Sequence, residues 1–299
     1  MANFCAVIMA KEEKAVIDRV VDYYLDLGAT RAVVYFDGTP DFSMDDRGGR
    51  LDFIIADEAF WVPITGRRSE MYDVRQTSMY KYAIEQAYEE WLFFVDCDEY
   101  LVSSRPISEI LDHVPETEDI LRVHNVEAVW GPGDDRDKYL GATWFRPATK
   151  SANKQRALKL IYGDLHKYMH SGLFGHSAGK HFVRTGRTYQ NTTAHTSVHG
   201  DGRPGRWADK LLDDEIFVCH FDAMSFEHWR KKFIFRYQTK DAFSTIRDTR
   251  NQVFDLVARE SELGDEKLRE LFERLYCLSS LQIFALKPLK LAFQRNIFE

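Results

Sequence analysis

The sequence predicts an α/β protein with a mixed, mostly parallel β-sheet flanked by helices and followed by a helical C-terminal lobe. Short apolar runs alternate with amphipathic helical segments from the N-terminus to residue 130. Residues 4–36 follow the order strand, helix, strand, which is the connection that parallel neighbours need. Helical spacing returns over residues 225–290. With 299 residues, of which 44% are hydrophobic, the chain can bury a sizeable core.

The first parallel pair is expected between residues 4–9 and 32–36. Both segments, FCAVIM and AVVYF, are short apolar runs that predict buried strands. The helix between them is expected over residues 12–27, and Gly28 provides a natural stop. Its apolar positions follow helical spacing: Val16, Ile17, Val20, Val21, Tyr24 and Leu27.

The same alternation continues and then weakens. Strands are expected at 51–56, 91–95, 120–130 and 216–221, and helices at 70–90 and 106–114. Residues 131–215 are rich in glycine, histidine and charge, so they predict long functional loops. Two or three helices are expected over 225–290. The predicted organisation is a catalytic domain at 1–224 and a helical extension at 225–299.

Composition narrows the class of protein. A net charge of -7 and a pI near 5.8 give no electrostatic basis for nucleic-acid binding. No apolar run reaches the length of about 18 residues that suggests a membrane span, and the apolar start suits a first strand better than a signal peptide. The four scattered cysteines form no CxxC, which favours a reducing, cytoplasmic setting without a disulfide or zinc framework.

Acidic residues follow two of the predicted strands directly. Asp37 comes after AVVYF, and Asp96-Cys97-Asp98-Glu99 comes after WLFFV. Ligands of open parallel sheets bind outside the carboxyl ends of the strands. In an extended chain Asp96 and Asp98 would face one ligand while Cys97 points to the core. Such oxygen ligands suit Mg²⁺ or Mn²⁺. The alternative is an ordinary acidic surface turn.

Two other classes of phosphate-binding protein are excluded by the residues present. The haloacid-dehalogenase pattern needs a small hydroxyl or Val two residues after its second Asp, where Tyr100 stands. In VVYFDGT, Tyr35 occupies the place of that pattern's nucleophile. No GxGxxG follows the first strand, which excludes the dinucleotide fingerprint.

The order of these motifs resembles the GT-A glycosyltransferases of family 2 type, in particular the DxDE branch similar to family 92. The resemblance covers residues 3–235 and rests on the N-terminal block, Gln76 on a helix, and EWLFFVDCDEYL. Lys11-Glu12-Glu13 stands where that branch has Lys-Asn-Glu. GKHFVR (179–184) resembles the family's lysine-containing strand, and CHFDAMSFEHWRKKF (219–233) its closing histidine segment.

The resemblance implies a UDP- or GDP-sugar donor and a divalent cation, Mn²⁺ or Mg²⁺. It places Asp37 near the nucleoside, Asp96 at the ribose or the metal, and Asp98 at the metal, with His220 completing the metal shell. Lys180 would contact diphosphate or an anionic acceptor, or is an ordinary strand-edge charge; His220 has the alternative of a core histidine. The donor-binding set is Lys11, Glu13, Asp37, Gln76, Asp96 and Lys180.

The expected reaction is transfer of a hexosyl group to a hydroxyl of a glycan or lipid-linked acceptor, with inversion, in polysaccharide or glycoconjugate synthesis. A cation at the diphosphate would neutralise the charge that develops as it leaves. A carboxylate must take the acceptor's proton. WGPGDDRDKY supplies Asp134, Asp135 and Asp137, of which Asp135 is preferred; the alternative is a solvated acidic loop.

Two other functions stay open at the level of sequence. A sugar-phosphate nucleotidyltransferase would share the sheet and the acids, but its glycine-rich phosphate loop is missing at MAKEEK. An inactive sugar-binding relative is favoured by Glu12 and disfavoured by Asp96 and Asp98. The tail, residues 281–298, mixes large apolar residues with cations. It is expected to pack on the sheet or to contact the inner face of an anionic membrane peripherally.

Overall fold

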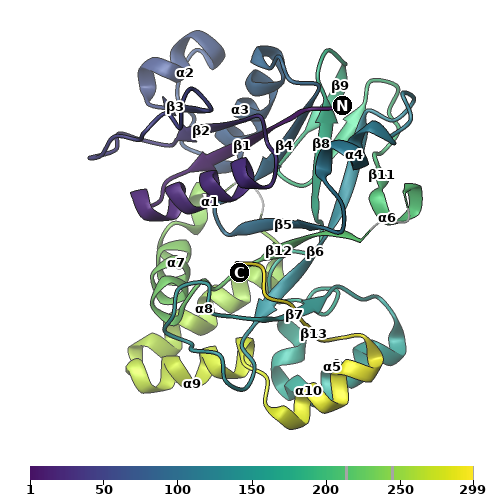
Figure 1. Ribbon diagram of the computed structural model, residues 1–299. Helices are drawn as coiled ribbons and strands as arrows, with labels where there is room; N and C mark the ends of the chain where they lie inside the picture. Colours follow the sequence, from purple (N-terminus) through teal and green to yellow (C-terminus); the bar gives the residue numbers. More distant parts are fainter. Residues whose placement is uncertain (213–214, 244–245, 299) are drawn as a thin grey trace. The chain divides into compact units, whose positions relative to one another are not determined.

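The computed structural model describes residues 1–212, 215–243 and 246–298 (Figure 1). The chain forms two compact units: residues 1–124 with 178–218, and residues 125–177 with 219–299. The expected boundary at residue 224 divides the chain by function and stays a prediction. Positions 244 and 245, inside the expected helical segment 225–290, lie outside the described residues.

The first unit is built on a parallel sheet. Its strands lie in the order β3-β2-β1-β4 and all three neighbouring pairs are parallel. β8 then pairs antiparallel with β4, and residues 120–123 of β6 pair antiparallel with β8. This mixed, Rossmann-like α/β sheet confirms the predicted fold class. The strands are β1 (Phe4–Ala10), β2 (Arg31–Phe36), β3 (Leu51–Ile55), β4 (Trp91–Val95), β5 (Glu99–Ser103), β6 (Ile120–Val129) and β8 (Lys180–Arg184).

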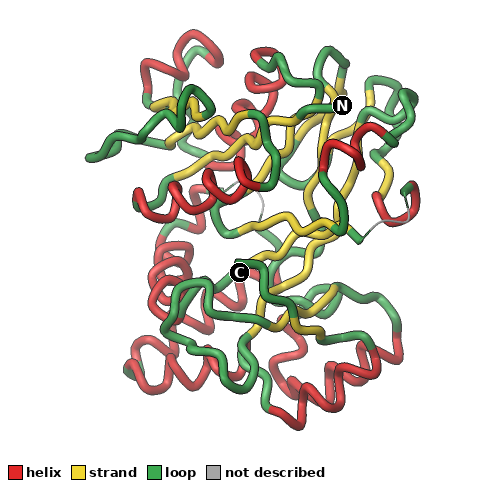
Figure 2. Tube along the Cα trace, viewed as in Figure 1, coloured by secondary structure: helices red, strands yellow, loops and turns green. Residues whose placement is uncertain are grey.

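Helices cover both faces of this sheet because the side chains of each strand alternate. Cys5, Val7 and Met9 of β1 lie in one core with the buried residues of α2 (Glu58–Thr65) and α3 (Tyr72–Gln86). The other face meets α1 (Lys14–Asp26), whose Tyr24 ring lies 5.9 Å from the ring of Phe93. Figure 2 shows these helices beside the yellow strands. α1, α3 and the short α4 (Ile107–Asp112) were predicted from the sequence; α2 was not.

The strand order of the first unit reverses between β1 and β4. From β1 the chain proceeds through β2 and β3 on one side, and β4 then pairs on the other side of β1. Their register sets Ile8 opposite Val95, so both strands end at the same edge. Such a switch point opens a crevice at the carboxyl ends of the strands. The loops that follow, residues 11–13 and 96–98, therefore border this crevice.

The second unit combines a small antiparallel sheet with helices. Residues 126–129 of β6 pair with β7 (Trp144–Pro147), which pairs with β13 (Phe293–Gln294). Within the described residues after 225, four α-helices are present where two or three helices were expected, because Gly264 and the Ser279 capping box separate segments of similar periodicity. The helices of this unit are α5 (Ala152–Tyr162), α7 (Phe226–Gln238), α8 (Asp248–Glu262), α9 (Asp265–Tyr276) and α10 (Ser280–Leu286), with the 3₁₀ segments η1 (Gly163–Tyr168), η2 (Lys240–Ala242) and η3 (Lys287–Leu289).

The expectation of long loops over 131–215 was wrong in part. The segment contains elements of only two to eleven residues, and most are too short to show a clear period in the sequence. Besides β7, α5 and β8 these are β9 (Tyr189–Thr192), β10 (Ser197–His199), β11 (Arg206–Trp207) and α6 (Ala208–Leu211). The strand expected at 216–221 is present as β12 (Ile216–His220). Among the described residues, no helix has the length and apolar character that crossing a bilayer requires.

Candidate functional site

An acidic turn follows β4 at the edge of the first unit's sheet. All five residues of β4 are buried, and the chain then bends: the Glu99 N–H donates to the Asp96 carbonyl (3.1 Å) and the Asp96 N–H to Glu99 Oε2 (2.9 Å). The extended conformation expected for residues 96–98 is therefore wrong. The expected alternation is nonetheless present, because Cys97 is buried while Asp96 and Asp98 are partly exposed.

Lys180 holds two carboxylates of this turn. Its Nζ, fully buried at the start of β8, lies 2.6 Å from Asp96 Oδ2 and 2.8 Å from Glu99 Oε2. Burial alone would lower the pKa of Lys180, but the charges of Asp96 and Glu99 raise it above its ordinary value. The ammonium is therefore charged at neutral pH. Two of its three N–H donors are directed to the protein's own acids, and a contact of Lys180 with a diphosphate or an anionic acceptor stays a prediction.

Gln76 fixes the other oxygen of Asp96. Its Nε2 donates to Asp96 Oδ1 at 3.1 Å from the buried face of α3. Of the donor-binding residues predicted from the sequence, the structure thus brings Gln76, Asp96 and Lys180 together. Asp96 is locked in one orientation by two donors from two different elements, which is the arrangement that preorganised sites require.

Asp98 has the properties of a divalent-cation ligand. Its carboxylate is partly exposed on the turn, at the carboxyl end of a parallel strand. Both oxygens of Asp96 already accept hydrogen bonds, although each carboxylate oxygen can accept a second interaction. The carboxylates of Asp96 and Asp98 offer the oxygen atoms that Mg²⁺ or Mn²⁺ prefers, and a metal role for either residue stays a prediction.

A cavity of about 770 Å³ opens beyond the ends of β1 and β2. Ligand sites of proteins are typically about 300–1,000 Å³. Burial raises the pKa of Cys97, and the charge of Glu12 raises it further, followed by those of Asp98 and Asp96. Glu12, which lines the cavity, therefore lies near Cys97 of the acidic turn. The lining residues include the predicted Lys11 and Glu13: Lys11, Glu12, Glu13, Lys14, Phe36, Thr39, Pro40, Asp41 and Phe42.

Asp37 is buried directly after β2 and carries two ion pairs. Arg75 binds it through two nitrogens (2.9 and 2.5 Å), and Arg68 Nη2 adds a third contact at 2.7 Å. The Asp37 N–H donates to the Ala10 carbonyl at 2.7 Å, which ties the loop to the end of β1. Sequence analysis found Asp37 but missed both arginines, because no local pattern links them to it.

The three acids proposed as bases have different surroundings in the second unit. Asp134 accepts hydrogen bonds from the Gly131 N–H, the Thr143 N–H and the Thr143 hydroxyl, so it organises the loop. Asp137 is exposed and paired with Arg269 at 3.0 Å. Asp135 is also exposed, and its Oδ1 accepts from the Asp137 N–H at 3.0 Å.

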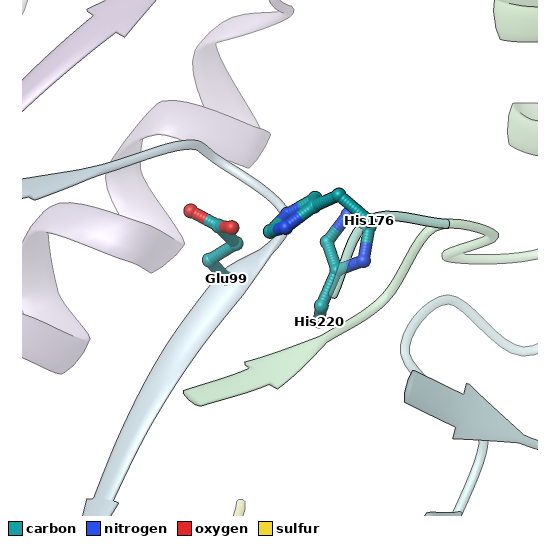
Figure 3. A group of neighbouring side chains, drawn as sticks. All are labelled: Glu99, His176 and His220. Carbon is teal, nitrogen blue, oxygen red and sulfur yellow. The ribbon is translucent and has the colours of Figure 1, made fainter. Parts of the chain in front are cut away.

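His220 ends β12 in the second unit and is buried beside His176. Their ring centroids are 4.6 Å apart, and Figure 3 shows the two imidazoles next to each other. A Cβ at Gly175 would lie 3.0 Å from His220 Cε1, so glycine permits this approach. Glu99, drawn in the same figure, belongs to the first unit. His176 was not singled out from the sequence, and the metal role of His220 stays a prediction.

A buried ionic cluster supports the segment that follows His220. Arg250 binds both oxygens of Asp222 (2.6 and 2.7 Å), the Tyr276 hydroxyl donates to Oδ2 at 2.6 Å, and Lys232 lies 3.3 Å from Oδ1. Burial alone would raise the pKa of Asp222, but the charges of Arg250 and Lys232 lower it well below its ordinary value. The cluster joins the segment after β12 to α7, α8 and α9.

Comparisons with known proteins gave distant structural likenesses. No family model and no curated protein matches this chain. A structure of HddC from Yersinia pseudotuberculosis is 12% identical, with a TM-score of 0.29 over 46% of this chain and 67% of that one. Glucosyl-3-phosphoglycerate synthase from Mycobacterium tuberculosis, in complex with Mn²⁺, UDP and phosphoglyceric acid, is 13% identical; its TM-score is 0.28 over 61% of this chain and 56% of that one.

S. aureus TarS, residues 1–349, in complex with UDP-GlcNAc, is 13% identical with a TM-score of 0.31, over 91% of this chain and 72% of that one. At these identities and TM-scores the likenesses assign no activity to this chain. A function for this chain must therefore be inferred from its own residues.

Proposed function

We propose that the chain is a metal-dependent glycosyltransferase that uses a nucleotide-diphosphate sugar. The observation that carries the proposal is the acidic turn at the switch point between β1 and β4, beside a cavity of about 770 Å³. Open α/β sheets bind their ligands at this point. A cavity with charged and aromatic walls next to oxygen ligands suits a nucleoside joined to a diphosphate.

Each residue of the first unit then has a distinct task. The nucleoside occupies the cavity lined by residues 11–14, Phe36 and residues 39–42, and the N–H of Asp37 holds the adjoining loop to the end of β1. Asp98, with Asp96 beside it, would hold the Mn²⁺ or Mg²⁺, which would supply positive charge against the departing diphosphate. Lys180 and Gln76 keep Asp96 oriented. Asp135 belongs to the second unit, and for it we propose the role of the base that takes the proton of the acceptor hydroxyl.

We propose in addition which donor and acceptor the chain uses and how the reaction changes the sugar carbon. A UDP- or GDP-hexose donor, an inverting outcome, and a glycan or lipid-linked acceptor in polysaccharide synthesis follow from the family resemblance of the motif order. A nucleotidyltransferase would instead bind nucleoside triphosphates, so the choice of nucleotide in the binding experiment separates the two activities.

Nucleotide binding is expected to depend on Asp98. UDP or GDP with Mn²⁺ should raise the melting temperature, because a ligand in hundredfold excess over its Kd adds about 2.7 kcal/mol of stability. Asp98→Asn should lose the Mn²⁺-dependent part of the shift in a thermal-denaturation assay. Asp26→Asn, an exposed position at the end of α1, serves as the control and should keep it. An undiminished Mn²⁺-dependent shift in Asp98→Asn would contradict the assignment.

The proposed base is tested by separating turnover from binding. Asp135→Asn is expected to lower kcat by about 10²- to 10⁴-fold, the range of general-base catalysis, without changing the nucleotide-induced melting shift. Asp255→Asn is the control, since it removes an exposed carboxylate of α8 that is not a candidate base. Sugar transfer is measured by release of the nucleoside diphosphate. Equal rates for Asp135→Asn and wild type would remove Asp135 from the reaction.

A further inference from the structure

The charges of this acidic protein are unevenly distributed. The whole chain has 40 Lys and Arg against 47 Asp and Glu. Residues 150–168 and 280–298 together carry eight Lys and Arg and a single acid, Asp164, which is itself paired with Arg274 at 2.8 Å. These two segments form α5 with η1 and α10 with η3. The cations are Lys150, Lys154, Arg156, Lys159, Lys167, Lys287, Lys290 and Arg295.

α10 and η3 present an apolar stripe to solvent. The positions 281, 284, 285 and 288 have the spacing of one helix face, and all four are exposed. Leu281 and Phe284 each keep 77% of their surface accessible, while Ile283 and Leu286 on the opposite face are buried. The segment therefore packs on its own unit with one face and leaves a second apolar face uncovered.

α5 extends this surface. The two segments are neighbours, because Ile161 and Leu165 of the first and Gln282 of the second line one cavity of about 510 Å³, and α5 lies beside α10 in Figure 1. Leu160 of α5 is 87% exposed. We call the exposed Leu160, Leu281, Phe284 and Leu289, together with Lys159, Lys287 and Lys290 next to them in the chain, the α5–α10 face.

Three properties of this face identify its partner. It is locally cationic in an acidic chain, it exposes large apolar side chains, and its lysines flank those side chains. Among the described residues, none pairs with Lys154, Lys159, Lys287 or Lys290 in an ion pair. Apolar side chains that enter the headgroup region beside unpaired lysines are the features of interfacial anchoring on anionic bilayers.

We propose that the α5–α10 face docks the protein onto an anionic lipid bilayer. The apolar stripe inserts at the boundary between headgroups and acyl chains, while the lysines contact lipid phosphates. β13 remains paired with β7, so the tail both packs on the sheet and supplies the membrane contact. Docking does not depend on the reaction catalysed, and the experiment below is independent of nucleotide binding.

Flotation of the full chain with vesicles tests the proposal. The wild type should float with vesicles that contain phosphatidylglycerol and remain behind with phosphatidylcholine alone. Leu281→Asp with Phe284→Asp should abolish flotation. Leu263→Asp, at a 66% exposed position at the end of α8, is the matched control and should float as the wild type does. Melting temperatures of all variants establish that they are folded.

The charges are tested separately. Lys287→Glu with Lys290→Glu should lower vesicle partitioning at least about tenfold and flatten its dependence on salt, since each lysine near an anionic surface contributes about 1 kcal/mol. Lys81→Glu, exposed on α3, is the control. The proposal is overturned if the wild type does not float with anionic vesicles. It is also overturned if both double variants float as the wild type does. If the wild type does not bind vesicles but forms a dimer that Phe284→Asp dissociates, the occupant of this face is a second copy of the chain and not a bilayer.

Discussion

Lys180→Met is expected to lower the free energy of unfolding by about 3–5 kcal/mol, the range observed when one partner of a buried ion pair is removed. The substitution keeps the length of the side chain but leaves Asp96 and Glu99 without their shared counter-charge. Urea denaturation followed by circular dichroism measures the loss. Lys81→Met, at an exposed position on α3, should stay within about 0.5 kcal/mol of the wild type.

The pH dependence of this loss follows from the raised pKa of Lys180. A lysine whose pKa is higher in the folded state contributes stability that is complete below its unfolded value of about 10.4 and declines as pH rises through the folded value. The difference between wild type and Lys180→Met should therefore be constant from about pH 6 to pH 9. Lys180→Arg should recover part of the stability. Equal stability of wild type and Lys180→Met would exclude the three-residue cluster as a support of the acidic turn.

Asp222→Asn is expected to destabilise the second unit by about 3–5 kcal/mol, because it leaves the Arg250 guanidinium buried without a counter-charge. The pKa of Asp222 is lowered in the folded state, so its contribution is present above the unfolded value of about 3.9 and is lost as pH falls through the folded value. The difference from wild type should hold from about pH 5 to pH 8 and shrink below about pH 4.

Two further variants make the Asp222 experiment specific. Asp255→Asn alters an exposed carboxylate of α8 and should change the unfolding free energy by less than about 0.5 kcal/mol. Asp222→Leu combined with Arg250→Met removes both charges and should restore much of the loss, since apolar replacements of buried pairs are often tolerated. Additive losses in that double variant would argue against a coupled pair.

The sequence predicted the central strands well because their signal is local. β1, β2 and β4 are continuous apolar runs, and α1 shows clear helical spacing. α2 escaped notice because it is short and contains Pro63. β8 was recognised only by resemblance, since its ends Lys180 and Arg184 look like surface residues but are buried in ion pairs.

The site was predictable only where its residues follow strands. Asp37, Asp96 and Asp98 were found because the end of a parallel strand is visible in the sequence. Arg68 and Arg75, 31 and 38 positions from Asp37, reach it through the loop between α2 and α3 and through α3 itself. The partners of His176 and Asp222 are likewise distant in the chain. Periodicity and spacing therefore could not predict their roles.

The placement of β8 between β4 and β6 has a consequence for folding during synthesis. The strand that joins these two neighbours is made 85 residues after the end of β4 (residue 180 against 95), once the whole segment 125–177 has been synthesised. Until then β4 presents an apolar edge with unpaired backbone groups, a surface that invites aggregation. We therefore expect nascent chains of this protein to be prone to aggregation until residues 180–184 have been synthesised.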